Sequence, residues 1–140
     1  MRIVGSNGGS SCEQSNAAVT SWTTIASLPI AIYYLAMVTL QGKAYAIGGA
    51  NSGNVAQTSV NMYDSVSGWV AKAAMPTGRY AHAALALDDD RALVCGGNAP
   101  SSTVNTCIIY TASTDTWTTA PAMAQARAHL SLVMSEGTWH

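Results

Sequence analysis

The chain has little charge and no phenylalanine. Charged residues make up 9% of its 140 residues, far below the roughly 25% of an average soluble domain. Six Lys and Arg against seven Asp and Glu leave a formal net charge of −1. Without a basic field to attract phosphates or anionic headgroups, neither nucleic acid nor a membrane surface is expected as a partner. Tyr, Trp and aliphatic side chains must fill the core instead of Phe.

Long apolar runs are also missing. The longest, residues 28–40, contains a proline and two tyrosines and is shorter than the roughly 20 residues needed to cross a bilayer as a helix. No membrane insertion is therefore expected. The sequence also lacks a nucleotide-binding loop, zinc-type cysteine spacing, a nucleophile elbow and paired glutamates. These absences predict no catalytic residues, no metal site and no cofactor, and the chain is not expected to be an enzyme.

Cysteine is scarce, and its count of three is odd. Cys95 and Cys107 fall on successive predicted strands of one hairpin, where a cross-strand disulfide and two buried thiols are both open alternatives. The compartment is not determined by the sequence. The low charge and the abundance of Ser, Thr, Ala and Gly favour an extracellular or cell-surface setting.

What the chain does contain is a repeat. Tryptophans recur at intervals of 47 and 48 residues, at positions 22, 69 and 117, and the same landmarks follow each other between them. The landmarks are Trp22, Trp69 and Trp117, the pairs Gly48-Gly49 and Gly96-Gly97, and Tyr63 and Tyr110. A period of this size indicates a repeat architecture, in which each unit covers an apolar face of its neighbour.

Each unit is predicted to form four antiparallel strands joined by short turns, because short apolar runs alternate with turn signals and no helical periodicity competes. The expected strands are residues 33–40, 44–47, 59–63 and 69–74, and then 80–87, 91–95, 104–110 and 117–122. Asp88, Asp89 and Asp90 are interpreted as a solvated turn, since the ligand pattern of a calcium loop is absent.

These landmarks resemble the kelch repeat. The resemblance rests on the Arg-x-x-His of Arg79 and His82, the strand into Gly96-Gly97, Tyr110, Trp117, and Met123 before Arg127. In the preceding unit Ile32 occupies the arginine position. In the third unit His129 follows Arg127 by two residues rather than three, so one residue is expected to be missing there.

In the kelch family each repeat forms one blade of a β-propeller. The resemblance therefore implies an all-β fold of four-stranded antiparallel blades, with an incomplete propeller in this chain. Residues 22–134 would hold the blades, and 135–140 a tail or the start of a further strand. Residues 1–21 would be a degenerate partial blade (strands at 2–5 and 17–20, with Gly8-Gly9 as the glycine pair) or an irregular leader. A first strand of a third blade is expected at 128–134.

The repeated side chains have a structural and a functional interpretation. His82 and His129 could bind a metal or act as a base near the propeller axis. Their repetition favours structural histidines bonded to the backbone, since a catalytic site needs one constellation in one place. By the same logic Arg79 and Arg127 are expected to bond carbonyls or a neighbouring turn. The tryptophans are expected to pack between blades rather than to stack on a sugar or peptide.

Propellers close with about 4–8 blades, and this chain supplies two complete ones. Three explanations stay open: a piece of a larger propeller, two copies that close a six-bladed ring, or other chains that supply the missing blades. The function expected first is a non-enzymatic protein-binding or scaffolding module, with a protein partner. Its candidate binding loops contain Asn51, Ser52, Asn54, Gln57, Asn98, Ser101 and Ser102.

Two other functions are weighed. The first alternative is a structural subunit of a multi-chain assembly. A distant alternative is a fragment of a copper enzyme similar to galactose oxidase, although the copper-binding set of that family cannot be placed on these positions.

Overall fold

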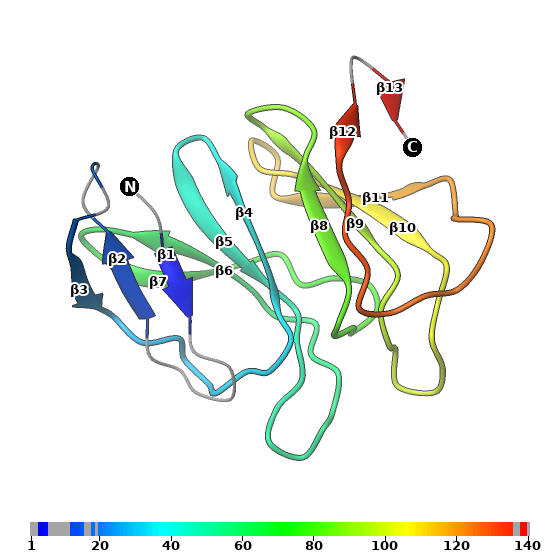
Figure 1. Cartoon of the computed structure of the whole chain (residues 1–140), viewed down its shortest axis with the longest axis horizontal. Helices are drawn as coiled ribbons and strands as arrows, with labels where there is room; N and C mark the ends of the chain where they lie inside the picture. The colour runs from blue at the N-terminus through cyan, green and yellow to red at the C-terminus, as the bar shows by residue number, and fades with distance from the viewer. Residues whose placement is uncertain (1–2, 6–11, 16–17, 19, 136–137, 140) are drawn as a thin grey trace.

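All regular structure in the described residues is β-strand. Figure 1 shows a computed structural model that describes residues 3–5, 12–15, 18, 20–135 and 138–139. Every strand pairing in it is antiparallel, which confirms the all-β prediction. The described part of the chain contains no helix long and apolar enough to cross a membrane.

The strands form three larger sheets and a C-terminal hairpin. Sheet I contains β1 (Ile3–Gly5), β2 (Cys12–Ser15) and β3 (Trp22–Ile25). Sheet II contains β4 (Ala36–Leu40), β5 (Lys43–Ile47), β6 (Val60–Asp64) and β7 (Gly68–Lys72). Sheet III contains β8 (Ala83–Ala86), β9 (Arg91–Cys95), β10 (Cys107–Thr111) and β11 (Thr116–Ala120). The hairpin pairs β12 (Met134–Ser135) with β13 (Thr138–Trp139).

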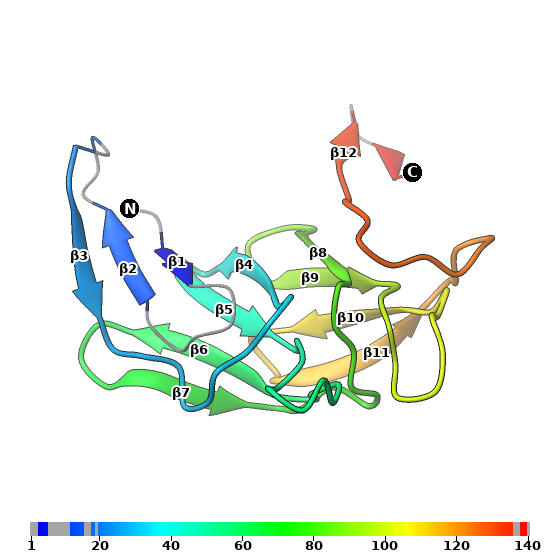
Figure 2. The same ribbon diagram turned by 60° about the horizontal axis from the view of Figure 1, so that its bottom comes forward.

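The sheets follow one another in chain order across Figure 1 and stay side by side in Figure 2. In sheets II and III each strand pairs with the next along the chain, as predicted for one unit. The turn between β4 and β5 is Gln41-Gly42, and both residues have positive φ (51° and 72°). Positive φ at both central residues is the geometry that matches the twist of a tight hairpin.

The main core lies between sheets II and III. Alternate residues of each strand point to it, as the two-residue period of a strand requires. Sheet II contributes Val38, Leu40, Tyr45, Ile47 and Val60, and sheet III contributes Ala92, Val94, Ile108 and Tyr110. A smaller cluster of Cys12, Leu28 and Ala46, with Ile25, Leu35 and Trp69 beside it, joins sheet I to sheet II.

The first strand of each unit begins later than predicted. Expected at 33–40 and 80–87, these strands are observed as β4 and β8, which begin at Ala36 and Ala83. The cause is a left-handed backbone at Tyr34 (φ 53°) and Ala81 (φ 54°), which interrupts the extended conformation.

The third strand of the first unit, predicted at 17–20, is observed earlier in the chain, as β2. Its register pairs Ser15 with Trp22, just as β6 pairs Tyr63 with Trp69. Ala18 and Thr20 lie in the turn and bend before β3. Gly8 and Gly9, predicted to be the glycine pair, lie outside the described residues.

The predicted first strand at 128–134 is also corrected. Residues 121–133 form no strand, and Met134 pairs only within the hairpin. Within the described residues, the backbone hydrogen bond that this segment donates is from the amide of His129 to the carbonyl of Ala81 (2.8 Å), and Ala81 is not part of a strand.

Candidate functional site

The connection between sheets II and III is repeated after sheet III. Residues 73–82 lead from β7 to β8, and residues 121–130 leave β11 along the same hydrogen bonds. In the first connection, the amide of Met75 donates to the carbonyl of Thr58 (2.9 Å) and that of Arg79 to Gln57 (3.2 Å), and the Arg79 carbonyl accepts from the amide of Gly49 (2.9 Å). In the second, the amide of Met123 donates to the carbonyl of Asn105 (2.8 Å) and that of Arg127 to Val104 (3.3 Å), and the Arg127 carbonyl accepts from the amide of Gly97 (2.9 Å). The connection that precedes sheet III is therefore repeated, with the same hydrogen bonds, after it.

Three left-handed residues form a hydrogen-bonded ladder across the sheets. The amide of Ala81 donates to the carbonyl of Tyr34 (3.0 Å), and the amide of His129 donates to the carbonyl of Ala81 (2.8 Å). Their φ angles are 53°, 54° and 52°. Each non-glycine residue in this conformation costs roughly 1–2 kcal/mol. His129 therefore corresponds to Ala81, and the sequence interpretation that paired it with His82 is wrong.

The residue equivalent to His82 is Leu130. A Cβ built on Gly48 would lie 2.8 Å from Cε1 of His82, and one built on Gly96 would lie 3.2 Å from Cδ2 of Leu130. The arginine carbonyl lies 2.6 Å away in both cases. No residue is missing from the third unit; a histidine occurs one position earlier, at a different place in the repeat.

Arg79 is buried and bound to the backbone of sheet III. Its Nη1 donates to the carbonyls of Gly96 (3.1 Å) and Thr106 (3.0 Å), and Nη2 donates to the Thr106 hydroxyl (3.1 Å). Burial lowers the pKa of the guanidinium. Arg127, at the same place after sheet III, is exposed, since no sheet among the described residues covers it.

His82 lies buried beside Arg79, and neither ring nitrogen has a hydrogen-bond partner. The predicted bond from this histidine to the backbone is thus not formed with good geometry, although the Ile47 carbonyl slightly favours the charged ring. Burial, and then the charge of Arg79, lower the pKa of His82 to about 4. The ring is therefore neutral at physiological pH and acts as packing between sheets II and III.

The tryptophans join successive sheets. The indole Nε1 of Trp69 donates to the carbonyl of Ala26 (2.8 Å), and that of Trp117 to the carbonyl of Ala73 (2.9 Å). Trp22 lies on sheet I, the first sheet that the structure describes, and is 41% exposed.

Asp115 adds a second tie between sheets II and III. Its Oδ1 accepts from the amide of Ala73 (2.9 Å) and from the hydroxyl of Tyr110 (2.6 Å). The Tyr110 hydroxyl and the Ala73 amide lower the pKa of Asp115.

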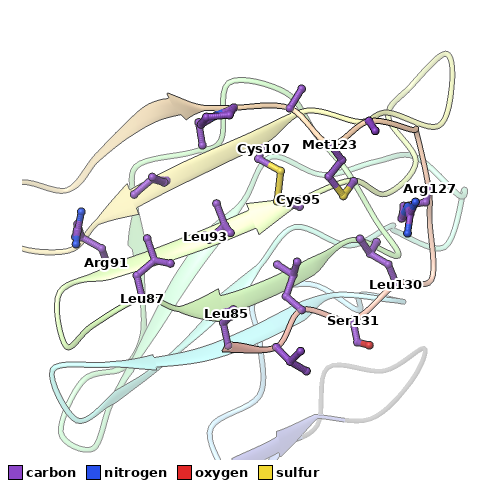
Figure 3. A pocket seen from close by; sticks show the side chains of 17 residues that line it. Leu85, Leu87, Arg91, Leu93, Cys95, Cys107, Met123, Arg127, Leu130 and Ser131 are labelled. Carbon is purple, nitrogen blue, oxygen red and sulfur yellow. A yellow bond between two sulfur atoms is a disulfide. The ribbon is translucent and has the colours of Figure 1, made fainter. Parts of the chain in front are cut away.

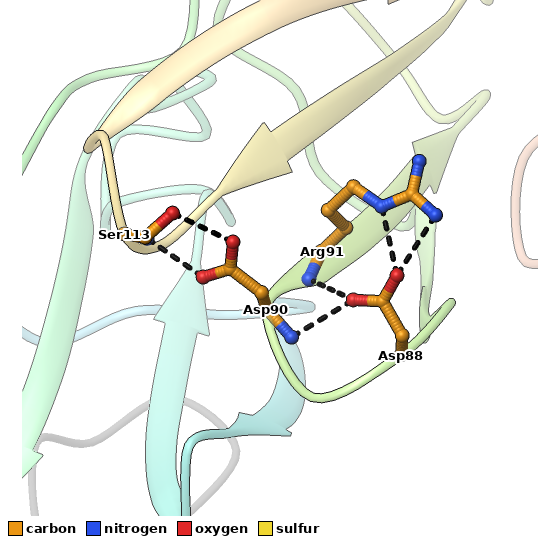
Figure 4. A network of polar contacts seen from close by, with 4 residues as sticks. All are labelled: Asp88, Asp90, Arg91 and Ser113. Carbon is orange, nitrogen blue, oxygen red and sulfur yellow. Dashed lines mark hydrogen bonds and ion pairs between the residues drawn. The ribbon is translucent and has the colours of Figure 1, made fainter.

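The aspartates of the β8–β9 turn accept hydrogen bonds from other groups of the protein, and Figure 4 shows those of Asp88 and Asp90. Asp88 accepts from the amides of Asp90 and Arg91 (2.8 Å each) and pairs with the Arg91 guanidinium (2.8 Å). Asp90 accepts from the amide and hydroxyl of Ser113 (2.7 Å each). Gln41 reaches this turn from sheet II. Within the described residues no group of three His, Cys, Asp or Glu side chains could hold a metal ion.

The predicted binding loops project from the same end of sheets II and III, at the bottom of Figure 1. Some of their polar residues shape the loops themselves. Asn51 Oδ1 accepts from the amides of Gly53 and Val55 (3.0 Å each), and Asn98 Oδ1 accepts from the Thr103 hydroxyl (2.7 Å). Gln57 donates to the Val55 carbonyl. The exposed residues are Ser52, Asn54, Ser101 and Ser102.

The sequence interpretation missed an aromatic cluster beside these loops, made of Tyr33, Tyr34, Tyr80 and His129. The Tyr34 ring centroid lies 6.4 Å from that of Tyr33, 6.5 Å from that of Tyr80 and 5.5 Å from that of His129. Backbone bridges join Tyr33 to Ala50 and Tyr80 to Asn98, at the start of each loop. The adjacent tyrosines Tyr33 and Tyr34 are visible in the sequence. The contact between the rings of Tyr34 and His129 is not, because it depends on the hydrogen-bonded ladder of the backbone.

A cavity of about 870 Å³ opens on the far face of sheet III (Figure 3). Its wall is mostly apolar, although Arg91, Arg127 and Ser131 also line it. The disulfide between Cys95 and Cys107 forms part of the wall, so the disulfide, one of the two alternatives left open by the sequence, is the one observed. The apolar residues at the centre of the wall on the side of sheet III are Leu85, Leu87, Leu93, Cys95, Cys107 and Ile109, with Arg91 and Ala120 beside them. Leu130, Leu132 and Met123 of the C-terminal segment form the other side.

This far face repeats the face of sheet II that sheet III covers. In the strand register, Leu93 and Cys95 of sheet III occupy the positions of Tyr45 and Ile47 in sheet II. The other wall residues of sheet III likewise have equivalents in sheet II. The corresponding residues of sheet II are Val38, Leu40, Tyr45, Ile47, Val60 and Met62, all in the core between the sheets or packed against it.

Comparisons with known proteins give no identification. No protein-family model matches the chain, and no curated protein matches it either.

Proposed function

We propose that the sheets are blades of a kelch-type β-propeller, and that the chain is a non-enzymatic protein-binding or scaffolding module. Further blades, from the same or another polypeptide, would complete it. The observation that supports this proposal is the correspondence between two faces. One is the face of sheet II that sheet III covers, and the other is the far face of sheet III that lines the cavity, here named the open face. A face that repeats a buried interface position by position suits the same kind of partner, another antiparallel sheet.

The interface between sheets II and III defines the chemistry of that partner. Sheet III presents small side chains, Ala84, Ala86 and Ala92, to sheet II, which lets the two backbones approach closely. It also donates the Trp117 indole N–H to Ala73. Pro121 stands where Ala73 stands, one residue beyond the last strand, so its carbonyl is the acceptor for an incoming indole.

A test of the open face uses charge. In the absence of another partner, the apolar face of sheet III is expected to make copies of the chain associate. Leu93→Glu places a carboxylate in the cavity wall and should shift the chain to monomer in size-exclusion chromatography with light scattering. Val66→Glu, at a turn residue that is 93% exposed, is the matched control and should leave the distribution unchanged. A wild-type chain that is monomeric at every concentration would contradict the proposal.

The same open face also favours the second candidate, a structural subunit of a multi-chain assembly. Alanine at Ser52, Asn54, Ser101 and Ser102 separates the two functions, because these exposed loop residues lie away from the open face. A binding module should lose affinity for its protein partner in this variant. A purely structural subunit should assemble with unchanged stoichiometry and affinity.

A further inference from the structure

The aromatic cluster is built on backbone that disfavours large side chains. Tyr34, Ala81 and His129 occupy the same left-handed position in successive units. Ala81 shows that a methyl group satisfies the ladder. Tyr34 is nevertheless a bulky residue in this conformation, and 48% of it is exposed, so burial does not explain its ring. Residues held in sparsely populated conformations concentrate at binding and catalytic sites.

The small side chain of Ala81 lets rings from two different units meet. Tyr34 and His129 lie on either side of it in the ladder, and their rings contact edge to face with interplanar angle 90°. Tyr33 and Tyr80 flank Tyr34 at tilts of 39° and 34°. Because the rings are tilted rather than coplanar, the cluster presents a ridged apolar surface.

The tyrosine hydroxyls of the cluster, each of which can donate and accept a hydrogen bond, are not used within the described residues. No described residue accepts a hydrogen bond from the hydroxyls of Tyr33, Tyr34 or Tyr80. The side-chain oxygens of Asn51 and Asn98, in the two loops bridged to Tyr33 and Tyr80, already accept hydrogen bonds within those loops. Neither ion pair of the described chain includes a residue of the cluster. The fitting ligand is therefore uncharged and rich in hydrogen-bond acceptors.

We propose that the aromatic cluster binds a proline-rich peptide segment in the polyproline II conformation. Such a segment has no internal hydrogen bonds, so its carbonyls are free to accept from the tyrosine hydroxyls. Proline has no amide donor, so such a segment requires few acceptors from the surface that binds it. Its rings fit between tilted aromatic rings, the mode by which aromatic-lined domains recognise proline-rich ligands.

The adjacent loops suit the flanks of such a ligand. Tyr33 and Tyr80 are bridged to the first residues of the two loops, whose exposed tips are Ser52, Asn54, Ser101 and Ser102. Rigid tyrosines surrounded by Ser, Asn and Gly are the composition by which protein-binding loops combine an anchor with adaptable hydrogen bonds. This surface lies apart from the open face of sheet III, and its proposal does not depend on a further sheet.

The test is titration of the full chain with a fluorescein-labelled decaproline peptide, followed by fluorescence anisotropy. The wild-type chain should bind saturably. Tyr34→Asn should weaken binding at least about tenfold, as expected for loss of an aromatic anchor, and asparagine tolerates the left-handed backbone. His129→Ala is a second variant at the exposed edge of the cluster. Val66→Ala, remote from the cluster, should bind as the wild type does.

Thermal unfolding of each variant separates loss of binding from loss of fold. No saturable binding of decaproline by the wild-type chain overturns the proposal. Binding that is unchanged in both Tyr34→Asn and His129→Ala also overturns it. Saturable binding of cellohexaose or chitohexaose in place of the peptide assigns the surface to sugars instead. Light scattering of Leu93→Glu reports on the open face alone, so the two proposals fail separately.

Discussion

The indole Nε1 of Trp117 lies 2.9 Å from the carbonyl oxygen of Ala73, so the last strand of sheet III is tied to the chain just beyond the last strand of sheet II. Trp69 makes the same bond to Ala26 of the unit before. Trp69 and Trp117 thus each join the last strand of their own sheet to the chain that follows the preceding sheet.

Replacing Trp117 with Phe removes this bond and keeps an aromatic ring. The expected loss of stability is about 1–2 kcal/mol, from a net hydrogen bond and the smaller buried area. Urea unfolding measures it. Trp22→Phe is the matched control at the exposed position and should change stability by less than about 0.5 kcal/mol. Equal losses of stability in Trp117→Phe and Trp22→Phe would contradict the role of the Trp117 hydrogen bond in joining the two sheets.

His82 makes stability depend on pH. Burial, and then Arg79, depress its pKa to about 4 from 6.5. Between these two pH values His82 is protonated in the unfolded chain but not in the folded chain. The free energy of unfolding therefore falls as the pH drops from about 6.5 toward 4. The full effect is about 3 kcal/mol.

The variant that isolates this effect is His82→Leu, which copies the residue at position 130. Its stability should stay level across the same range, above the region where the aspartates titrate. Urea midpoints at several pH values give the comparison. Parallel curves for the variant and the wild type would show that another group is responsible.

Arg79 and Arg127 form a natural pair for testing burial. Arg79→Met leaves the carbonyls of Gly96 and Thr106 without their donors in a buried place, so a loss of about 2–4 kcal/mol is expected. Arg127→Met, at the exposed equivalent, should cost less than about 0.5 kcal/mol. Denaturant midpoints for the two variants check this. If both variants lose stability equally, the equivalence of the two positions is contradicted.

Gly48 and Gly42 separate close packing from backbone strain. Both have positive φ (62° and 72°), so alanine is strained at either. A Cβ at Gly42 would meet nothing within 4 Å, whereas at Gly48 it would lie 2.6 Å from the Arg79 carbonyl. Gly42→Ala should cost about 1 kcal/mol and Gly48→Ala about 1–3 kcal/mol more. Thermal unfolding of the two variants measures the difference, and equal costs would mean that the connection can move aside.

The repeat of landmarks was sufficient to predict four antiparallel strands per unit, since Trp69 and Trp117 fix the fourth strand and the glycine pairs end the second. It could not locate the start of the first strands. That boundary depends on the left-handed backbone at Tyr34 and Ala81, which neither residue type favours and which the ladder between units imposes.

The histidines show why the site was harder to predict than the fold. His82 and His129 occur at nearly the same distance from an arginine, and residue type suggested equivalence. Hydrogen bonds instead align His129 with Ala81, and packing aligns His82 with Leu130. The aromatic cluster that results combines residues from three units, and no local pattern in the sequence reports it.

The connection at residues 121–130 has a consequence for the order of folding during synthesis. Its amides are already bonded to sheet III before any strand of a further unit exists. A chain that emerges amino-terminus first would thus set the starting point of each new sheet as it completes the last one, and growth would run in one direction. Proteolysis of ribosome-bound chains checks this when a C-terminal linker brings residue 130 out of the exit tunnel, because an unprotected sheet III at that stage would rule the order out.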